Sequence, residues 1–294
     1  MIDAVGKPML DEVARLSERV REETVSFVAE SECIHGVLAV ASDPKPIGVL
    51  FVHGWGGIRG GPHNLLTHLA RSAAEAGYNS LRFDLRGRGQ SDGTAEGTSL
   101  ASMAADTIAA AKCLRECGVR KIVMIGICSG GNVAIGVLDR VTDAAGLFML
   151  SVYPFSDGDS FARDTTRTVY YARSYWQKLW RRETWCKFFR GEIFFKQIFR
   201  VLFGHFRKDQ RKAVEAAQPS PLDNLSRRRV PVKMVYGEAD PDFRASYDYY
   251  AEFAKNSGVS IDFYTIPDAN HNFCATAWKR EITDQLLTFL TELP

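Results

Sequence analysis

Residues 121–131 read KIVMIGICSGG, and this stretch decides the fold. The apolar run KIVMI has the composition of a buried strand, and it passes directly into the glycine-rich sequence GICSGG, after which a helical pattern begins. A strand that turns sharply into a helix is the repeating unit of a parallel α/β sheet. Two adjacent residues at this turn, Cys128 and Ser129, carry side chains that can attack a carbonyl carbon.

Strand-like runs rich in Val, Ile and Phe alternate with helical patterns along the rest of the chain. This alternation predicts an α/β fold with a mostly parallel eight-stranded sheet and helices on both faces. The first two runs have no helix between them, so we expect an antiparallel edge there. The first eighteen or so residues fit a short helix. The predicted strands are 23–29, 33–40, 47–54, 79–85, 121–127, 145–154, 232–240 and 261–267, and the predicted helices are 64–76, 101–117, 132–141, 245–256 and 279–293.

A basic and aromatic segment interrupts this alternation. Residues 161–215 hold fourteen Lys and Arg against five Asp and Glu, together with fourteen aromatic side chains. Their apolar residues recur at spacings of three and four, which predicts two or three amphipathic helices. We therefore expect a helical lid at 157–216, inserted into a core formed by 1–156 and 217–294.

Composition excludes several classes of protein. The first twenty residues contain acids and bases throughout, so they do not resemble a signal peptide, and no apolar stretch is long enough to span a bilayer. The six cysteines form no CxxC pair, which argues against a zinc cluster or a disulfide framework and favours a cytoplasmic location. A net charge of +2 without a recognition motif disfavours nucleic acid. We expect no metal and no cofactor.

Polar and glycine-rich sequences follow five of the predicted strands. They are HGWGG, DLRGRGQSDG, GICSGG, GEAD and PDANH, in chain order. Parallel sheets place their working residues at the carboxyl ends of strands, where these sequences lie. The order of nucleophile, acid and histidine resembles the α/β-hydrolase superfamily over about residues 23–155 and 217–294.

The spacing of the glycines indicates which of the adjacent residues Cys128 and Ser129 is the nucleophile. A turn of this kind needs small residues two before and two after its central residue. Around Cys128 these positions are Gly126 and Gly130, whereas a turn centred on Ser129 would place the β-branched Ile127 in the crowded position. We therefore predict Cys128 as the nucleophile.

The resemblance implies the remaining site residues. Asp240 in GEAD has the superfamily's usual spacing for the acid, with Asp242 as the alternative, and His271 follows the last strand. The backbone N–H groups of Trp55 and Ser129 would form the oxyanion hole. The nearby His53, Asp84 and Arg86 are expected to be structural.

A cysteine at this position allows acyl transfer as well as hydrolysis. The helix N-terminus and His271 are expected to lower the pKa of Cys128, which favours the attacking thiolate. Attack on a small-molecule ester or thioester gives an acyl-cysteine, which is itself a thioester. The sequence therefore predicts a hydrolase, with an acyltransferase as the alternative. A non-catalytic ligand-binding protein of the same fold is the second alternative.

Within the superfamily, the elbow is similar to those of dienelactone hydrolases and polyhydroxyalkanoate synthases, which both use cysteine, histidine and aspartate. The former generally lack so long a lid, and the latter are usually longer chains. The lid itself resembles, more loosely, hydrolases associated with bacterial exosortase and exopolysaccharide loci.

The predicted lid suggests partners for the reaction. Its bases could meet the phosphates or carboxylates of coenzyme A or an acyl carrier protein, next to an apolar wall. Contact with an anionic membrane surface is another interpretation, and so is a lid whose aromatics form its own core beneath a solvated basic face. The bases in question are Arg181, Arg182, Lys187, Arg190, Lys196 and Arg200.

Overall fold

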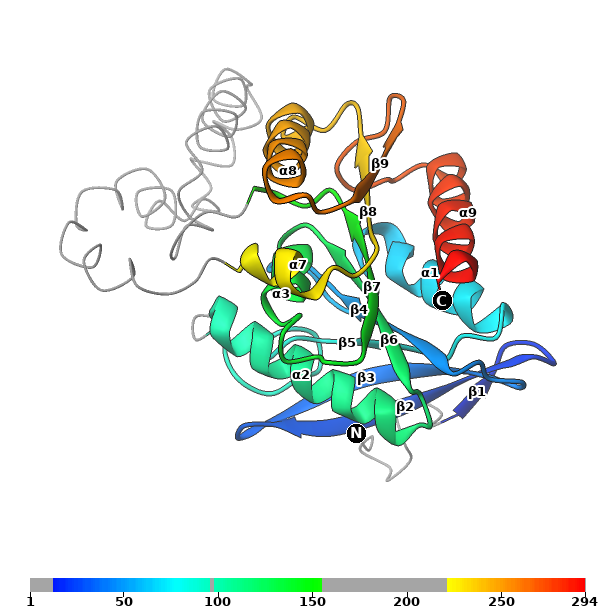
Figure 1. Cartoon of the computed structure of the whole chain (residues 1–294). Coiled ribbons are helices and arrows are strands. Elements are labelled where there is room, and N and C mark those ends of the chain that lie inside the picture. Colours follow the sequence, from blue (N-terminus) through cyan, green and yellow to red (C-terminus); the bar gives the residue numbers. More distant parts are fainter. Residues whose placement is uncertain (1–12, 96–97, 155–220, 294) are drawn as a thin grey trace, which may run out of the picture. The chain divides into compact units, whose positions relative to one another are not determined.

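A nine-stranded sheet forms the centre of the described part of the chain (Figure 1). The computed structural model describes residues 13–95, 98–154 and 221–293. The strand order is β1-β2-β3-β5-β4-β6-β7-β8-β9, and every pair from β5 to β9 in that order is parallel, which confirms the predicted fold class. The strands are β1 (Val13–Arg15), β2 (Val20–Ala29), β3 (Glu32–Ala41), β4 (Ile47–Val52), β5 (Ser80–Phe83), β6 (Lys121–Ile127), β7 (Ala144–Leu150), β8 (Val232–Gly237) and β9 (Ile261–Ile266).

The antiparallel edge has one strand more than predicted. β2 and β3 pair antiparallel as expected, but β1 adds a ninth strand, with Val13 opposite Glu23. The short helix predicted here is therefore wrong for residues 13–18, none of which is helical, and the rest of that prediction up to residue 12 lies outside the described residues. The cause is local: the Oγ of Ser17 accepts hydrogen bonds from the N–H groups of Arg19 and Val20, both at 3.1 Å. Such bonds favour a turn over a helix, and β1 then covers the open edge of β2.

Four of the five predicted helices agree with the observed ones to within three residues, and the fifth, α3, ends five residues before the predicted end. α3 begins at Ser129, three residues before the predicted start, because the chain passes from Cys128 directly into the helix. The short elements η1 and α7 were not predicted. The helices are η1 (Pro62–Asn64), α1 (Leu65–Glu75), α2 (Leu100–Glu116), α3 (Ser129–Gly136), α7 (Asp223–Arg228), α8 (Phe243–Ser257) and α9 (Thr276–Glu292).

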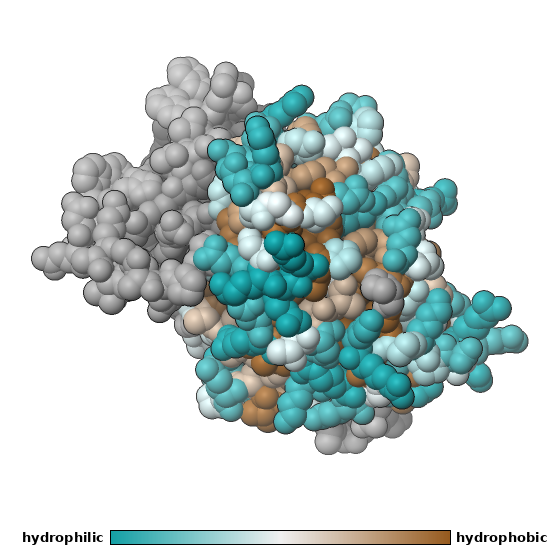
Figure 2. Space-filling view, viewed as in Figure 1, coloured by the Kyte–Doolittle hydropathy of each residue, from teal (hydrophilic) through white to brown (hydrophobic). Residues whose placement is uncertain are grey.

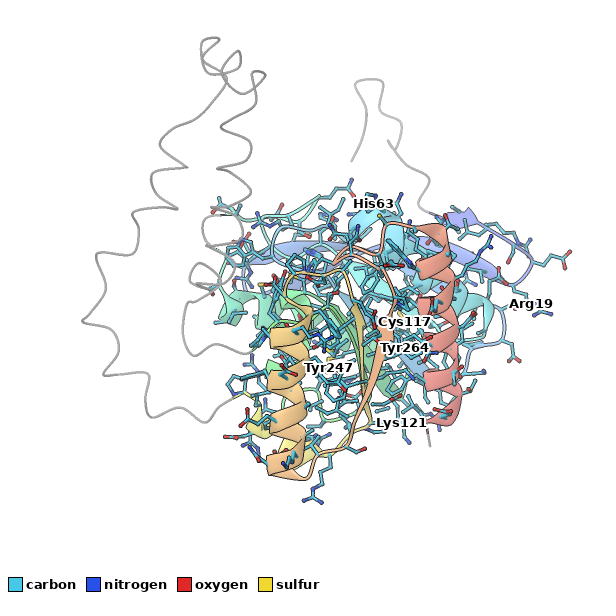
Figure 3. All side chains as sticks on the ribbon, turned by 90° about the horizontal axis from the view of Figure 1, so that it is seen from above. Arg19, His63, Cys117, Lys121, Tyr247 and Tyr264 are labelled. Atoms are coloured by element: carbon cyan, nitrogen blue, oxygen red, sulfur yellow. The ribbon has the colours of Figure 1, made fainter. Side chains whose placement is uncertain are left out.

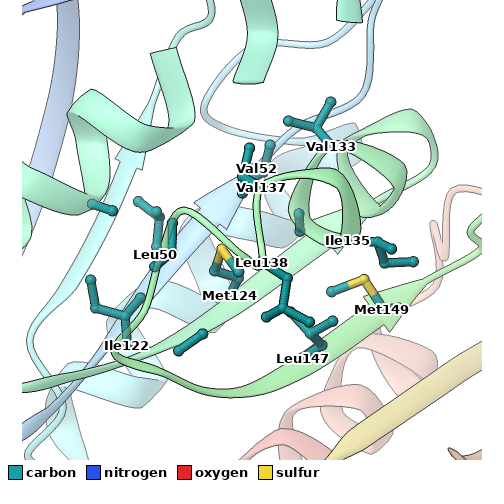
Figure 4. Packing of buried hydrophobic residues seen from close by; sticks show 14 of the residues in the cluster. Leu50, Val52, Ile122, Met124, Val133, Ile135, Val137, Leu138, Leu147 and Met149 are labelled. Carbon is teal, nitrogen blue, oxygen red and sulfur yellow. The ribbon is translucent and has the colours of Figure 1, made fainter. Parts of the chain in front are cut away.

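Helices cover both faces of the sheet, as the buried strands require. Successive side chains of a strand point to opposite faces, so a run that is apolar throughout needs a cover on each side. α1 and α9 pack on one face, while α2, α3, α7 and α8 pack on the other. Figure 4 shows part of the hydrophobic core on the face covered by α2, α3, α7 and α8. There, strand residues such as Leu50, Met124 and Leu147 pack with Ile135 and Leu138.

The last strand shows this two-sided packing residue by residue. Phe263 points toward α8, where its ring centroid lies 4.7 Å from that of Tyr247. The next residue, Tyr264, points toward α9, where its hydroxyl donates to the carboxylate of Glu281 at 2.7 Å. Tyr247 and Tyr264 accordingly lie on different sides of β9 (Figure 3).

The surface is mostly hydrophilic at the rim of the face shown in Figure 2, with hydrophobic residues toward its middle. Among the described residues, no helix has the length and apolar character needed to cross a membrane. The predicted lid at 157–216 lies outside these residues, so its helices and the domain boundaries remain predictions.

Candidate active site

The carboxyl ends of five parallel strands meet at one edge of the sheet. β6 lies between β4 and β7, and β8 and β9 continue the sheet beyond them. The pairing register holds the ends level, with Val52 beside Gly126 and Ile127 beside Leu150. Every residue that the sequence predicts for the site follows one of these strands, so the fold gathers all of them at this edge.

Cys128 occupies a sharp elbow between β6 and α3. Its φ of 56° and ψ of −129° lie in a region that non-glycine residues rarely adopt, at a cost of about 1–3 kcal/mol. A Cβ added to Gly126 would lie 2.3 Å from the Cα of Gly131, and one added to Gly130 would lie 2.2 Å from the carbonyl oxygen of Val52. Both positions therefore require glycine, which is the assumption behind the choice of Cys128 over Ser129 as the centre of the turn.

His271 lies between an acid and the thiol. Its Nδ1 donates to Oδ2 of Asp240 at 2.6 Å, and the Oδ1 of the same carboxylate accepts the backbone N–H of Asp242 at 3.1 Å. Asp240 is buried. Of the two acids that the sequence left open, the structure brings Asp240 to the imidazole, while Asp242 helps to orient it.

The surroundings of His271 favour its charged form. Burial by itself lowers the pKa of His271, but the hydrogen bonds to Asp240 and to the Cys128 side chain, with the charges of these groups, outweigh burial and raise the pKa to about 9. The predicted nucleophile and base are therefore in contact. An imidazolium beside a thiol at a helix N-terminus favours the thiolate.

The HGWGG loop lies directly against the thiol. A Cβ added to Gly54 would lie 3.4 Å from the Sγ of Cys128. The N–H of Trp55 donates to Oγ of Ser129 at 2.7 Å, and Ser129 is fully buried. The structure thus brings Trp55 and Ser129 together beside the nucleophile. The bond between them was not predicted, and it engages one of the two expected oxyanion donors.

Hydrogen bonds hold two of the residues that were expected to be structural, His53 and Asp84. His53 accepts the N–H of Leu85 at its Nε2 (3.0 Å) and donates from Nδ1 to the carbonyl of Gly54 (2.7 Å). Burial lowers the pKa of His53, so this imidazole is neutral. Asp84 accepts the N–H of Arg59 at 2.7 Å and pairs with its guanidinium.

Burial keeps two other cysteines, Cys113 and Cys117, protonated. Burial is the main cause that raises the pKa of Cys113 to about 11, and it raises the pKa of Cys117 as well. Both thiols therefore stay protonated at neutral pH. Among the described residues, no group of three or more His, Cys, Asp or Glu side chains could hold a metal ion.

Tyr153 is a member of the site that the sequence reasoning missed. Its hydroxyl lies 3.1 Å from Nε2 of His271, and the two rings stack with centroids 5.2 Å apart and planes at 11°. The signal that could have found it was its position at the same edge of the sheet. The predicted strand 145–154 includes Tyr153, whereas β7 ends at Leu150 and leaves Tyr153 just past the strand end.

The fold together with an elbow, an acid and a histidine at these strand ends defines an α/β hydrolase. The chain belongs to the alpha/beta hydrolase family, whose match covers residues 49–281. This confirms the predicted resemblance at the level of the superfamily and the prediction of an enzyme of this type. No curated protein matches the chain in sequence.

Solved structures share the fold at low sequence identity. An esterase of Pyrococcus furiosus is 19% identical, with a TM-score of 0.67 over 92% of this chain and 91% of that one. Est1E of Butyrivibrio proteoclasticus, solved with ferulic acid bound, is 16% identical, with a TM-score of 0.60 over 91% and 100% of the two chains. A dienelactone hydrolase of Anabaena variabilis is 14% identical, with a TM-score of 0.60 over 94% and 100%.

Proposed function

We propose that the protein cleaves an ester or thioester through Cys128, His271 and Asp240, by way of an acyl-cysteine. The observation that carries the proposal is the continuous chain of contacts from the Asp240 carboxylate through the imidazole to the thiol at the elbow. The Pyrococcus furiosus esterase among the structures of similar fold supports ester substrates in general.

The first half of the reaction forms the acyl-cysteine. The Cys128 thiolate attacks the carbonyl carbon, and the electron pair of the C=O bond moves onto oxygen. When the tetrahedral intermediate collapses, the bond to the leaving group breaks, and the imidazolium of His271 gives its proton to that group. Asp240 keeps the ring oriented and stabilises its charge before this transfer.

The negative oxygen of the intermediate needs donors beside the thiol. The backbone N–H of Ser129, at the start of α3, is one candidate, because the helix N-terminus favours negative charge. The Trp55 N–H can contribute in two ways: directly, once the Ser129 hydroxyl turns away, or through that hydroxyl, which accepts from Trp55 and can donate its own proton onward.

The second half releases the acyl group. Neutral His271 takes a proton from an acceptor, the acceptor attacks the thioester carbonyl, and Cys128 leaves as a thiolate. Water as the acceptor makes the enzyme a hydrolase, whereas an alcohol, amine or thiol makes it an acyltransferase. The basic and aromatic composition of 157–216 favours coenzyme A or an acyl carrier protein as the acyl carrier, with contact to an anionic membrane as another role for that segment.

Mass spectrometry of the protein after exposure to an acyl thioester tests the proposal. We expect an adduct on Cys128, loss of the adduct and of turnover in Cys128→Ala, and retention of the adduct in Ser129→Ala. Intact turnover in Cys128→Ala would overturn the proposal. Lost turnover in Ser129→Ala with normal turnover in Cys128→Ala would move the nucleophile to the serine.

Thiol alkylation separates this enzyme from a non-catalytic binding protein of the same fold. We expect Cys128 to react as a thiolate well below the ordinary thiol range, near 8.5 in model peptides, and to lose this reactivity in His271→Ala. An ordinary titration that does not depend on His271 would favour the binding protein.

A further inference from the structure

Tyr153 and Cys128 share one nitrogen of His271. Asp240 holds Nδ1, which leaves Nε2 for the thiol, and the Tyr153 hydroxyl lies 3.1 Å from that same Nε2. The Tyr153 ring stacks on the His271 ring, and Tyr153 is only 7% exposed. A phenol in this place is therefore a second partner for the reacting nitrogen of the site.

The fold holds this tyrosine firmly. Its carbonyl accepts the hydroxyl of Tyr250, on α8, at 2.8 Å, and the preceding carbonyl of Val152 accepts the hydroxyl of Tyr236, on β8, at 3.1 Å. Tyr250 is fully buried and also lies 3.1 Å from Oδ1 of Asn132, on the helix that follows the elbow. Two neighbouring elements thus fix the backbone that presents Tyr153 to the imidazole.

The hydrogen bond between Tyr153 and Nε2 of His271 reverses direction as the imidazole gains and loses its proton. Neutral imidazole, protonated at Nδ1 toward Asp240, accepts at Nε2, so the phenol donates to it. Imidazolium carries a proton at Nε2, for which the thiolate and the phenol oxygen compete. After acylation Cys128 is a thioester and no longer a strong acceptor, so the phenol is the stronger of these two partners of Nε2.

The acceptor molecule must reach Nε2 in order to lose its proton. We propose that Tyr153 is a positioning residue that occupies Nε2 of His271 in the acyl-enzyme, so that an acceptor displaces its hydroxyl before it is activated. This inference rests on the proposed function. The sequence of bonds is unchanged: the acceptor's proton goes to Nε2, the acceptor joins the acyl carbon, and the Cys128 thiolate leaves.

Tyr153→Phe keeps the stacked ring and removes only the hydroxyl. Without the phenol oxygen, the thiolate has no competitor for the Nε2 proton of the imidazolium, so the thiolate–imidazolium pair persists to lower pH, by about half a pH unit for an ordinary hydrogen bond. We also expect release of the acyl group to water to become about 3–10-fold faster, since no hydroxyl has to be displaced. Formation of the acyl-enzyme should change less than threefold.

The experiment combines two readouts on the full chain. The ultraviolet absorbance of the thiolate is followed against pH, and single-turnover mass spectrometry with an acyl thioester separates formation from release. Tyr264→Phe is the matched control, because its hydroxyl bonds to Glu281 on α9, away from the site. It should leave both readouts at the wild-type values.

The outcomes distinguish the two proposals. Absence of any Cys128 adduct in the wild type overturns the proposed function. A wild-type adduct with an unchanged or upward titration shift, or with slower release, in Tyr153→Phe overturns the role of Tyr153 alone. If that variant is unstable, the same titration in Tyr250→Phe, which frees the Tyr153 carbonyl, is expected to shift in the same direction, and no shift there counts against the inference.

Discussion

Two histidines come after parallel strands at the same edge of the sheet, and they have opposite properties. His53, after β4, is buried and bonds to backbone groups of Gly54 and Leu85, and burial lowers its pKa. His271, after β9, is partly buried, but its ionisable partners raise its pKa to about 9 against the effect of burial. Position after a strand therefore does not decide the pKa of a histidine. Its burial and the partner at each ring nitrogen do.

Removal of the His271 ring should have the largest effect. We expect His271→Ala to lower kcat/KM for an acyl thioester by about 10³-fold, because proton transfer and the charged partner of the thiolate are both lost. Steady-state assays measure this. His68→Ala, at an exposed position of α1, is the control and should match the wild type. Activity of His271→Ala within about tenfold of the wild type would remove the contrast between the two histidines.

Removal of the charge behind His271 should come second. Asp240→Asn is expected to lower kcat/KM by about 10²-fold or more, since the amide no longer stabilises the imidazolium. The alkaline limit of activity, set by the pKa of His271 at about 9 in the wild type, should move to lower pH. Asp242→Asn keeps the backbone N–H that orients Asp240 and should change activity less than threefold. Equal losses in both variants would contradict the assignment.

The structural histidine should show itself in stability. His53→Ala leaves the N–H of Leu85 and the carbonyl of Gly54 without their ring partner, which we expect to lower the free energy of unfolding by about 2 kcal/mol. Urea denaturation measures the difference, with His68→Ala again as control. A change below about 0.5 kcal/mol, the size of an ordinary surface substitution, would show that the ring is dispensable.

The pH dependence of stability should have opposite signs for the two rings. The native pKa of His271 is raised, so its contribution is complete below about 6.5 and declines as pH rises to about 9, by at most about 1.4 kcal/mol per unit. The native pKa of His53 is lowered, so its contribution is complete above about 6.5 and declines toward acid. Urea unfolding at several pH values, in the wild type and in each alanine variant, separates the two slopes. An alkaline decline that survives in His271→Ala would belong to another group.

The fold was accessible from the sequence because the buried strands are short apolar runs bounded by glycine-rich turns. The same runs located the site, since a parallel sheet gathers the loops after its strands at one edge. Gly126 and Gly130 predicted an elbow centred on Cys128, and in the structure a Cβ at either glycine would collide with backbone atoms. These inferences depend on local sequence and on one topological rule.

The remaining features depend on contacts between distant segments. The choice of Asp240 over Asp242 required the path of a turn, and the bond from Trp55 to Ser129 required a side-chain rotamer. Tyr153 reaches His271 across 118 positions of sequence, and only its place just past the end of β7 marks it. β1 is a different case: the hydrogen bonds that Ser17 accepts turn the chain onto β2 within a few residues, and a strand of three residues is too short to show an alternating pattern.

The strand order has a consequence for how reactivity appears during folding. β6 carries Cys128, but the acid and the imidazole follow β8 and β9, and β8 begins at Val232 while β7 ends at Leu150. Joining segments so far apart is slow, because closing the intervening loop costs conformational entropy before the stabilising contacts form. Until the last strand docks, the sulfur has no proton acceptor beside it and behaves as a common thiol. Regain of alkylation sensitivity on refolding should therefore report the completion of the sheet's final edge.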